Sequence, residues 1–319
     1  MSPSVDILLA TYNGARYLPE MLASLDAQTG IDFRILVRDD GSTDGTRDIL
    51  AAWAARQPQR VRLLPVDAPT GSASGNFGRL MLASTADYVL FADQDDIWLP
   101  TKVAATVDAI RAAERDLGGA GRPAMAFCDL KLVDGEGRTQ QESFRRFLGL
   151  DLPADVRFER LLLHNVVTGC AMGVNRAALE ACGQVPAEAV MHDWWLALLC
   201  SGLGTIRTMP ECLIDYRQHD GNVVGVKPSN PLATLPGFRR LSAIHANIRA
   251  YRRWLQGLYR QAALFRGRHG DRLAPRDRVM LDAFSGLADQ GPVARRLTVL
   301  RHGFRLKTIF QTMGFLARM

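Results

Sequence analysis

The stretch Asp87-Tyr-Val-Leu-Phe-Ala-Asp-Gln-Asp-Asp-Ile-Trp-Leu-Pro100 joins a short apolar run to a cluster of acidic residues. Its apolar part, residues 88–92, is rich in β-forming residues and predicts a buried strand. Three carboxylates follow, at Asp93, Asp95 and Asp96. Because like charges at the end of a buried strand repel one another, the pattern favours a divalent cation with oxygen ligands that also holds a phosphate. The alternative is an acidic turn in which Asp95 or Asp96 caps a helix beginning near Pro100.

The residues before this stretch predict strands that alternate with helices. Strands are expected at 5–10, 33–37 and 61–65. Helices are expected at 15–27, 46–55 and 100–116, and a further helix is expected to follow the glycine-rich stretch 71–78 and to end near Ser84. Such alternation implies right-handed crossovers and an α/β fold with a mainly parallel sheet. Ligands bind such sheets at the carboxyl ends of the strands. Three groups of polar residues fall at that edge: Thr11-Tyr12-Asn13, Asp39-Asp40 and Asp93 to Asp96.

The second half of the chain continues with less regular patterns. Strands are expected at 124–129, 166–174 (interrupted by Gly169), 206–209 and 213–216. Helices are expected at 158–163, 237–266, 275–289 and 292–316, and one within 189–203. Asp193 stands where the N-cap of the helix within 189–203 would lie. The polar stretch 134–155 is expected to cover one side of the site.

Bulk properties indicate an intracellular globular protein. The chain has 319 residues, of which 47% are hydrophobic and 23% charged, as in ordinary globular proteins. No apolar run is long enough to span a membrane, and no export signal precedes the first strand. The five cysteines form no CxxC pair, which favours buried thiols in a reducing compartment over disulfides or zinc. We therefore expect a cytoplasmic protein.

Charge divides the chain into two parts. From Gly237 onward there are 17 Lys and Arg against four Asp, whereas the residues before it are acidic overall. We expect a catalytic domain at 1–230 and a basic helical extension at 231–319. Apolar residues recur among the arginines of the last helix, which predicts contact with the inner face of a membrane. Packing on the catalytic domain and a dimer contact are the alternatives. No nucleic-acid recognition motif accompanies the charge.

Common nucleotide-binding and hydrolase motifs are missing. There is no GxGxxG after the first strand, no GxxxxGK[ST] and no GxSxG. The glycine-rich stretch Gly71 to Gly78 lacks the lysine of a P-loop, so we interpret it as a flexible loop.

Three motifs together resemble family 2 of the inverting GT-A glycosyltransferases. They are Ala-Thr11-Tyr-Asn-Gly, Asp39-Asp40-Gly-Ser-Thr-Asp-Gly-Thr and Ala-Asp93-Gln-Asp95-Asp96-Ile-Trp-Leu-Pro, and the resemblance spans about residues 4–225. His192-Asp193-Trp194-Trp195 and Tyr216-Arg-Gln-His219 further resemble the bacterial rhamnosyltransferase branch. The resemblance implies a GT-A fold and a nucleoside-diphosphate sugar donor.

The resemblance also implies roles for individual residues. Asp95 becomes the expected ligand of a Mg²⁺ or Mn²⁺ ion on the donor diphosphate, with His219 as a further metal ligand and Asp93 supporting the metal or the ribose. The nucleotide pocket maps onto Thr11, Tyr12, Asn13 and Asp40, where Asp40 accepts a hydrogen bond from the pyrimidine N3–H. Asp40 could instead be a simple turn residue.

The catalytic base expected from the resemblance is Asp193, preceded here by His192 in place of the family's second acid. A carboxylate opposite the leaving diphosphate can take the proton of the acceptor hydroxyl. Trp194 and Trp195 either form a sugar platform or belong to the core. His192 and Arg217 are placed at the donor or acceptor sugar, with Arg217 also suited to the diphosphate. The segments His164-Asn165 and Thr168-Gly169-Cys170 are expected on the acceptor side, with structural packing as the alternative.

The reaction implied by the resemblance is transfer of a sugar, L-rhamnose from dTDP-rhamnose, to a hydroxyl of a cell-surface saccharide or lipid-linked acceptor. One rival function is synthesis of a sugar nucleotide by a nucleotidyltransferase, which would need a basic glycine-rich loop near the N-terminus. Another is a non-catalytic sugar-nucleotide-binding or membrane-scaffold module. The three carboxylates Asp40, Asp95 and Asp193 argue against such a decayed site.

Overall fold

The computed structural model describes residues 3–150, 152, 154–219 and 237–304. The chain forms two compact units. The first comprises Met1–Val156, Val166–Ala187 and Met191–Val223, and the second Arg157–Asn165, Glu188–Val190 and Val224–Met319. The domain boundary expected at residues 230 and 231 lies outside the described residues.

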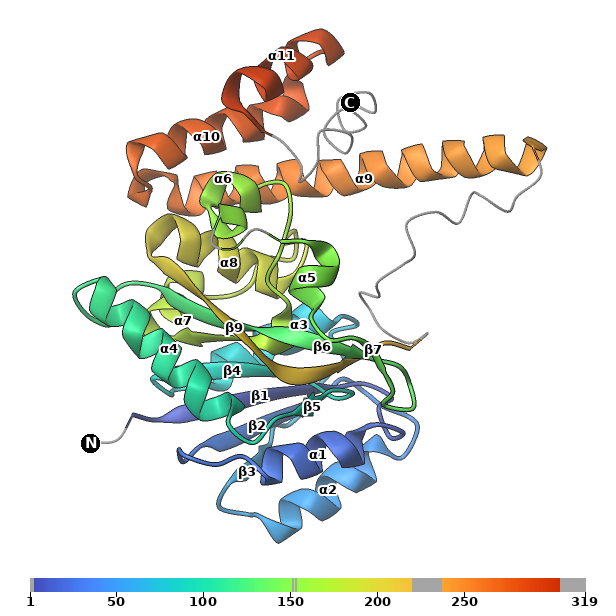
Figure 1. The fold of residues 1–319 in the computed structure, drawn as a ribbon, viewed down its shortest axis with the longest axis vertical. Helices are drawn as coiled ribbons and strands as arrows, with labels where there is room; N and C mark the ends of the chain where they lie inside the picture. Colours follow the sequence, from blue (N-terminus) through green and yellow to red (C-terminus); the bar gives the residue numbers. More distant parts are fainter. Residues whose placement is uncertain (1–2, 151, 153, 220–236, 305–319) are drawn as a thin grey trace. The chain divides into compact units, whose positions relative to one another are not determined.

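The first half of the sheet is parallel, with strand order β3-β2-β1-β4. Its strands are β1 (Val5–Thr11), β2 (Arg34–Asp39), β3 (Val61–Leu63) and β4 (Tyr88–Asp93). Helices α1 (Leu18–Asp26), α2 (Thr46–Arg56) and α3 (Ala73–Ala83) connect them (Figure 1). The central strands β1 and β4 read as apolar runs because both of their faces are covered, so nearly all of their residues are buried. The predicted alternation of strands and helices is confirmed here.

The second half of the sheet is mixed rather than parallel. It adds β8 (Met172–Asn175), β6 (Ala124–Val133), β9 (Thr205–Arg217) and β5 (Ile97–Trp98), while β7 (Thr139–Gln141) pairs with β6. β8 runs antiparallel to both β4 and β6, and β9 runs parallel to β6 but antiparallel to β5. Irregular register at Asp129 lets β6 and β9 bend, since bulges increase local twist. The sheet is therefore less parallel than the alternation predicted.

The structure corrects several local predictions. The glycine-rich stretch is not a flexible loop, because α3 begins at Ala73 and the Ser72 side chain caps it by accepting from Gly75 N. Residues 166–171 are not a strand and end in a short 3-10 helix, η2 (Gly169–Ala171). Helix α7 (Arg176–Cys182) was not predicted.

Neither Asp95 nor Asp96 caps the following helix. Helix α4 (Lys102–Asp116) begins after Thr101. Asp193 is not a cap either, because α8 (His192–Leu203) has Met191 at its N-cap and Asp193 in its first turn. The remaining short elements of the first unit are α5 (Phe144–Leu148) and η1 (Ala154–Val156).

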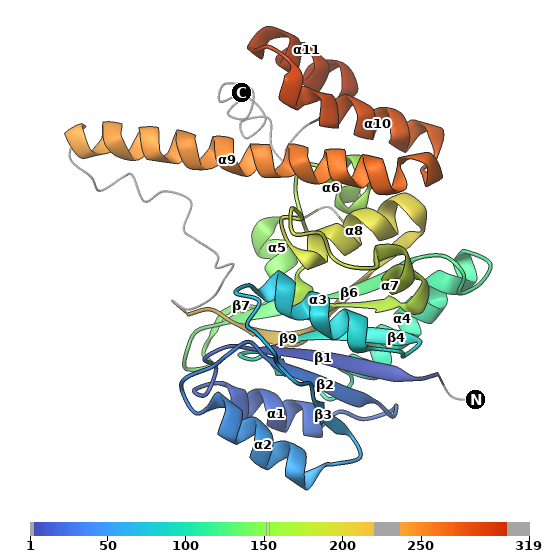
Figure 2. The same ribbon diagram turned by 180° about the vertical axis from the view of Figure 1, so that it is seen from behind.

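The second unit is helical. It contains α6 (Phe158–Leu161), α9 (Gly237–His269), η3 (Gly270–Arg272), α10 (Pro275–Ser285), η4 (Gly286–Asp289) and α11 (Pro292–His302) (Figure 2). Its core includes Leu258, Phe265, Leu281 and Phe284, which are almost fully buried. The three predicted helices are present, but α11 ends at His302, with Gly303 as its C-cap, and not at the predicted residue 316. Within that part of the chain, no helix combines the length and apolarity needed to cross a membrane.

Candidate active site at the carboxyl edge of the sheet

Hydrogen bonds join the loops that follow β1 and β2. Asn13, the only non-glycine residue with a positive φ (49°) among the described residues, accepts from Thr43 N (2.8 Å) with its side chain. Its own amide donates to Ser42 Oγ (2.8 Å), and the Gly14 amide donates to Thr46 Oγ1 (2.8 Å). Asn tolerates this left-handed backbone better than most residues. The predicted nucleotide-binding residues therefore lie on a rigid double loop.

Asp39 supports the same double loop. Its carboxylate accepts from Thr11 Oγ1 (3.0 Å) and from the amides of Gly41 (3.2 Å) and Ser42 (2.9 Å). Thr11, predicted to bind nucleotide, is 1% exposed and uses its hydroxyl in this contact. It therefore shapes the loop from within.

Asp40 lies at the end of β2 with every oxygen engaged. It accepts from Arg38 Nη1 (2.6 Å), from Thr70 N and Oγ1 (2.7 and 2.9 Å) and from Gly71 N (2.9 Å). Burial alone would raise the pKa of Asp40, but the hydrogen bonds from Thr70, Arg38 and Gly71 hold it below its usual range. That Asp40 accepts a hydrogen bond from a pyrimidine stays a prediction. The N3–H of the nucleobase would have to share the Asp40 carboxylate with the present donors or replace one of them.

Gln94, within the acidic stretch, ties that stretch to the first loop. Its side-chain oxygen accepts from Tyr12 N (2.7 Å) and its amide donates to Tyr12 O (2.9 Å). A Cβ on Gly14 would come within 2.3 Å of this side chain, so a larger residue there would have to displace Gln94 from its hydrogen bonds with Tyr12. The Tyr12 ring, predicted to contact nucleotide, is 58% exposed. Gln94 thus ties the backbone of Tyr12 to the acidic turn.

Asp93 lies in a cluster of negative charge. Burial and the neighbouring charges of Asp95 and Asp193 raise its pKa to about 7. The three carboxylates come from the end of β4, the turn after it and the first turn of α8. The structure therefore brings together residues that are about a hundred positions apart in the sequence.

Asp95 and His219, the two predicted metal ligands, are direct neighbours. The Asp95 Oδ2 to His219 Nε2 distance is 2.8 Å, and both side chains are largely buried. The His219 ring also lies 4.6 Å from the Tyr17 ring, centroid to centroid. Oxygen and imidazole ligands next to a repelling carboxylate suit Mg²⁺ or Mn²⁺.

A second set of side chains, Asp93, Asp96 and Cys170, also has ligand atoms within 4.8 Å of one another. Burial raises the pKa of the Cys170 thiol, and the charges of Asp96 and Asp93 raise it further. A protonated thiol is a poor ligand for a hard cation. Asp95 and His219 therefore fit the predicted ion better than this set does.

Arg217 has partners other than the predicted sugar or diphosphate. It is 1% exposed, and its guanidinium donates to Asp95 O (3.0 Å), Gly135 O (2.9 Å) and the Glu20 carboxylate (2.7 Å). Its backbone amide donates to Asp96 Oδ1 (3.2 Å). Arg217 therefore anchors β9 to the acidic turn from the protein side.

The beginning of α8 contributes Asp193 to the site. The side chain is 9% exposed and accepts from Trp194 N. A Cβ on Gly169 would lie 3.5 Å from Asp193 Oδ2 and 3.3 Å from His192 Nε2, so η2 packs directly on this turn. The helix N-terminus stabilises a negative charge at Asp193.

The aromatic residues around Asp193 belong to the core. Trp194 and Trp195 are 5% and 0% exposed, which fits packing better than a sugar platform. His192 stacks on Phe77 (4.3 Å between ring centroids) and is 3% exposed. Burial lowers its pKa to about 3. Neither of its ring nitrogens has a hydrogen-bond partner within the described ranges.

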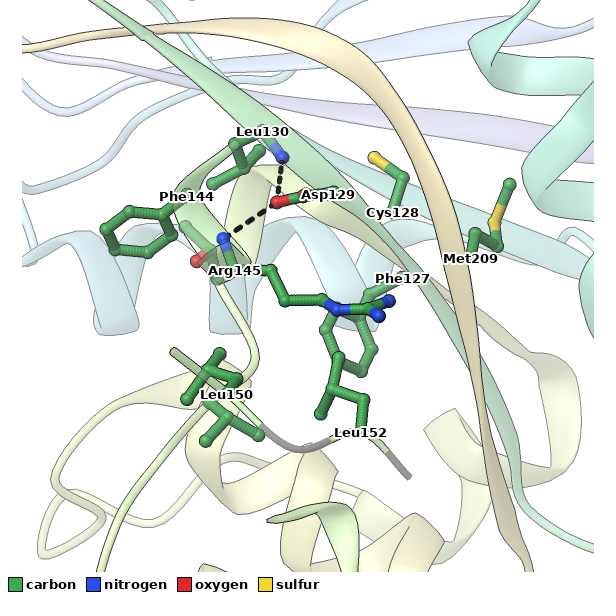
Figure 3. Close-up of a pocket in the computed structure, with 11 residues that line it drawn as sticks. Phe127, Cys128, Asp129, Leu130, Phe144, Arg145, Leu150, Leu152 and Met209 are labelled. Carbon is green, nitrogen blue, oxygen red and sulfur yellow. Dashed lines mark hydrogen bonds between the residues drawn. The ribbon is translucent and has the colours of Figure 1, made fainter. Parts of the chain in front are cut away.

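A recess is lined by residues of β6, β9 and α5 and of the segments that follow α5 and precede η2 (Figure 3). Its empty space, open solvent included, is about 300 Å³. Its lining is mostly apolar: Phe127, Cys128, Asp129, Leu130, Phe144, Arg145, Leu150, Leu152, Val166, Thr168 and Met209. Asp129 accepts from the amides of Leu130 (2.8 Å) and Arg145 (3.0 Å). The Arg145 guanidinium extends along the recess (Figure 3). Thr168 lines this recess, whereas His164 and Asn165 fall in the second unit. That these residues lie on the acceptor side stays a prediction.

No site prediction from the sequence includes Gln94 or Tyr17. Gln94 stands inside the acidic motif, so its position was a usable signal. Tyr17 had no such signal, because it contacts His219, which is distant in the sequence.

A family comparison agrees with this geometry. The model of "Glycosyl transferase family 2" matches residues 6–181, more than half of the chain. The chain belongs to glycosyl transferase family 2. This confirms the predicted family and makes the protein a glycosyltransferase rather than a nucleotidyltransferase. The matched range contains the ends of β1, β2 and β4 but stops before Asp193 and His219.

Curated relatives of this glycosyltransferase are moderately similar. The dTDP-rhamnosyl transferase RfbG of Shigella flexneri is 29% identical over 235 residues, which cover 69% of this chain and 75% of RfbG. An uncharacterised glycosyltransferase of Nostoc sp. is 28% identical over 227 residues, covering 68% of this chain. The match spans 66% of the Nostoc protein, just under two thirds of its length.

Solved structures confirm the GT-A-like fold of the transferase. The mannosyltransferase PcManGT from Pyrobaculum calidifontis, in complex with GDP-Man and Mn²⁺, has a TM-score of 0.55 at 17% identity and covers 99% of this chain and 79% of its own. Residues 1–349 of TarS from S. aureus, in complex with UDP-GlcNAc, reach 0.54 at 15% identity, covering 95% and 93%. At such identities the likeness concerns the fold alone.

Proposed function

We propose that this glycosyltransferase transfers L-rhamnose from dTDP-rhamnose to a hydroxyl of a cell-surface saccharide or lipid-linked acceptor, with a divalent cation and with inversion. The observation that carries the proposal is the meeting of Asp93, Asp95 and Asp193 at one edge of the sheet, with His219 on Asp95. The similarity to RfbG supports rhamnose as the sugar. The Mn²⁺ in PcManGT supports the cation.

Asp95 and His219 would hold the cation. Burial raises the pKa of Asp93, and the charges of Asp95 and Asp193 raise it further; a positive charge at this place would relieve the repulsion among the three carboxylates. A divalent ion bound there supplies charge stabilisation for the leaving diphosphate. Asp93 then orients the ion or the donor ribose from the buried side.

Asp193 would act as the base. As the acceptor oxygen forms its bond to the anomeric carbon, the bond to the diphosphate breaks and the hydroxyl proton passes to Asp193 Oδ. One displacement from the face opposite the diphosphate inverts the anomeric centre. No covalent sugar–enzyme intermediate is required.

The double loop after β1 and β2 would bind the nucleotide. Tyr12 offers an exposed ring for the base, and Asn13 holds the loop in its left-handed turn. Because the hydrogen bonds of Asp39, Asp40 and Gln94 already fix these loops, little ordering entropy remains to be lost on binding.

A panel of sugar nucleotides with and without Mn²⁺ tests the donor. We expect dTDP-rhamnose with Mn²⁺ to raise the melting temperature most, and to be the donor in a transfer assay with lipid-linked saccharides. A larger shift and transfer with UDP- or GDP-sugars would refute the rhamnose assignment.

The variant Asp193→Asn tests the base. We expect transfer to fall by roughly 10²–10⁴-fold, the usual contribution of general base catalysis, while donor binding persists. Asp108→Asn, which changes an exposed carboxylate on α4, is the matched control. Transfer near the wild-type rate in Asp193→Asn would show that another group takes the proton.

The recess beside Thr168 is the proposed acceptor side. Its apolar wall and the Arg145 guanidinium suit an acceptor with an apolar part and a negative charge, such as a saccharide on a lipid phosphate. We expect Arg145→Ala to raise the acceptor KM without changing donor binding. Arg146→Ala, an exposed arginine one position away, is the control. Equal acceptor KM values in both variants and the wild type would exclude the recess.

The proposed membrane contact uses α11. Val293, Leu297 and Leu300 are 70%, 62% and 62% exposed and recur at helical spacing, beside Arg296 and Arg301. An exposed apolar row with flanking cations suits an anionic lipid surface.

Sedimentation with vesicles containing phosphatidylglycerol tests this contact. The double change of Leu297 and Leu300 to Glu should abolish it, while Val279→Glu, an equally exposed residue on α10, should not. Unchanged sedimentation of the double variant would refute the membrane role. A change of oligomeric state would instead identify a dimer surface.

A further inference from the structure

Glu20 lies in the first turn of α1, outside the sequence motifs of the proposed donor site. Its side chain is 57% exposed, yet its carboxylate accepts a hydrogen bond from Arg217 Nη2 (2.7 Å) at the end of β9. The Arg217 guanidinium is almost fully buried. An ion pair between two exposed side chains stabilises a protein little. Here one partner is buried and makes further contacts, so Glu20 is tied to the interior of the protein.

The Arg217 guanidinium joins three separate segments of the chain. Besides its bond to Glu20, it donates from Nε to the carbonyl oxygen of Asp95 (3.0 Å) and from Nη1 to that of Gly135 (2.9 Å). Because a guanidinium is planar and its donors have fixed directions, its three acceptors must keep fixed positions relative to one another. The backbone of Asp95, a proposed metal ligand, is therefore held by the same group that binds Glu20.

The second proposed ligand, His219, is linked to this group through Tyr17. The guanidinium carbon of Arg217 lies 4.9 Å from the centre of the Tyr17 ring, a cation–π contact. The Tyr17 ring in turn lies 4.6 Å from the His219 ring, with 30° between the two planes. Tyr17 is the N-cap residue of α1, and its carbonyl oxygen accepts from Glu20 N (3.1 Å). The start of α1 thus contacts the supports of both proposed ligands.

The stability of α1 does not require this arrangement. An acidic residue in the first turn of a helix interacts favourably with the helix dipole without any partner. Asp48 illustrates this, because it is the third residue of α2 as Glu20 is of α1, and its exposed carboxylate has no hydrogen bond or ion pair within the described residues. Burying the Arg217 guanidinium is costly, and an apolar side chain of similar volume often serves the fold as well. The bridge from Glu20 to Asp95 therefore points to a functional constraint.

We propose that Glu20 is a positioning residue for the proposed cation site. By orienting the Arg217 guanidinium, it holds the backbone of Asp95 and the ring of Tyr17. Through them it keeps the Asp95 carboxylate and the His219 imidazole at the spacing that the cation requires. Groups that stand behind the ligands of a metal commonly set its affinity in this way. The inference rests on the proposed roles of Asp95 and His219.

Two variants of Glu20 separate its contact from its charge. Glu20→Ala removes the whole carboxylate, whereas Glu20→Gln removes the charge but keeps an oxygen that can accept from Arg217. We expect Mn²⁺ binding, followed by calorimetry in the presence of dTDP, to weaken about tenfold in Glu20→Ala and clearly less in Glu20→Gln. The Mn²⁺ concentration for half-maximal transfer should rise by the same factors, with little change in kcat at saturating Mn²⁺. Because Glu20 is half exposed, the metal-free variants should melt at most a few degrees below the wild type.

Asp48→Asn is the matched control. It removes the same charge at the same helix position, but from a side chain without a partner in the described part of the chain. We expect its Mn²⁺ affinity to equal that of the wild type. Wild-type affinity in Glu20→Ala, or the same loss in Asp48→Asn, would overturn the proposal. Equal losses in Glu20→Ala and Glu20→Gln would also overturn it, because charge alone would then explain the effect.

The variant Arg217→Lys tests the path of the effect. A lysine keeps the positive charge but has one nitrogen for the three acceptors, so Mn²⁺ binding should weaken. Adding Glu20→Ala to this variant should change the Mn²⁺ affinity little, because the group through which Glu20 acts is already lost. An undiminished further loss would overturn the inference. If Arg217→Lys does not fold, the Glu20 and Asp48 variants decide the question alone. A wild-type protein that does not bind Mn²⁺ would refute the proposed cation site, and this inference with it.

Discussion

Two regions at the same edge of the sheet differ in how well their buried charged groups are hydrogen-bonded. After β1 and β2, the carboxylates of Asp39 and Asp40 accept hydrogen bonds from backbone amides, hydroxyls and Arg38. After β4, Asp93 is repelled by its neighbours, and Asp96 and Lys102 retain polar atoms without partners among the described residues.

This difference separates stability from function. The saturated region stabilises the fold, because every buried charge there is compensated. The second region lowers stability, as expected where charges are arranged for a ligand rather than for the folded protein alone. Substitutions in the first region should therefore affect unfolding, and substitutions in the second should affect activity.

The largest effect is expected at Asp95. Asp95→Ala should reduce metal-dependent transfer by about 10²-fold or more, because one ligand of the cation is lost, while the metal-free melting temperature changes little. Transfer at several Mn²⁺ concentrations and calorimetric unfolding provide the two measurements. If Asp95→Ala instead loses much of its free energy of unfolding while its transfer depends on Mn²⁺ as in the wild type, the proposed contrast between the two regions is wrong.

Asp40→Asn should have the opposite signature. Breaking the buried pair with Arg38 should destabilise the protein by roughly 3–5 kcal/mol, measured by urea unfolding. Because the folded pKa of Asp40 is lowered, its stabilising effect is present above the unfolded pKa and is lost as pH falls through the folded pKa. Asp67→Asn, an exposed carboxylate in the following loop, is the control and should unfold like the wild type.

Gly14→Ala tests how the two regions are joined. The added methyl would collide with Gln94, so we expect a loss of about 1–3 kcal/mol from overpacking and a higher donor KM. Shortening Gln94 to Ala in the same protein should restore part of the stability. If the double variant is as unstable as the sum of the two single variants, the collision is not the cause.

Near neutral pH the smallest effect is expected at His192. Its folded pKa is about 3, below the ordinary 6.5, so from pH 6.5 down to about 3 the unfolded chain gains a proton that the folded chain does not. The free energy of unfolding should therefore decrease as the pH is lowered through this window, by at most about 1.4 kcal/mol per pH unit. His192→Phe should show a flatter profile in urea unfolding at pH 5 and 7. An identical slope in both proteins would contradict the neutral, buried state of this ring.

Much of the fold and part of the site follow from the sequence. The apolar runs before Thr11, Asp39 and Asp93 predict strands, and parallel alternation predicts that their ends meet. The family resemblance adds Asp193, which the structure brings close enough to Asp93 to raise its pKa.

The remaining features depend on contacts between distant residues. Gly75 and Gly78 suggested a loop, but packing on the sheet and the Ser72 cap make them helical. The guanidinium of Arg217 is a type of group that binds phosphate. In the fold it donates instead to the carboxylate of Glu20, almost two hundred positions earlier in the sequence. A lysine near the start of a helix is usually exposed, so the sequence does not indicate that Lys102 is buried, as it is in the structure.

The contacts that β9 makes with the acidic turn are expected to form late in folding. The contact between Arg217 N and Asp96 closes 121 residues of chain, and Glu20 and Arg217 are 197 positions apart. Contacts of such high sequence separation form slowly, because the entropy of closing the loop is lost before they stabilise anything. During synthesis, the parallel strands β1 to β4 can therefore pair first. The proposed pocket for the diphosphate is completed only when residues 205–219 have left the ribosome and joined the sheet.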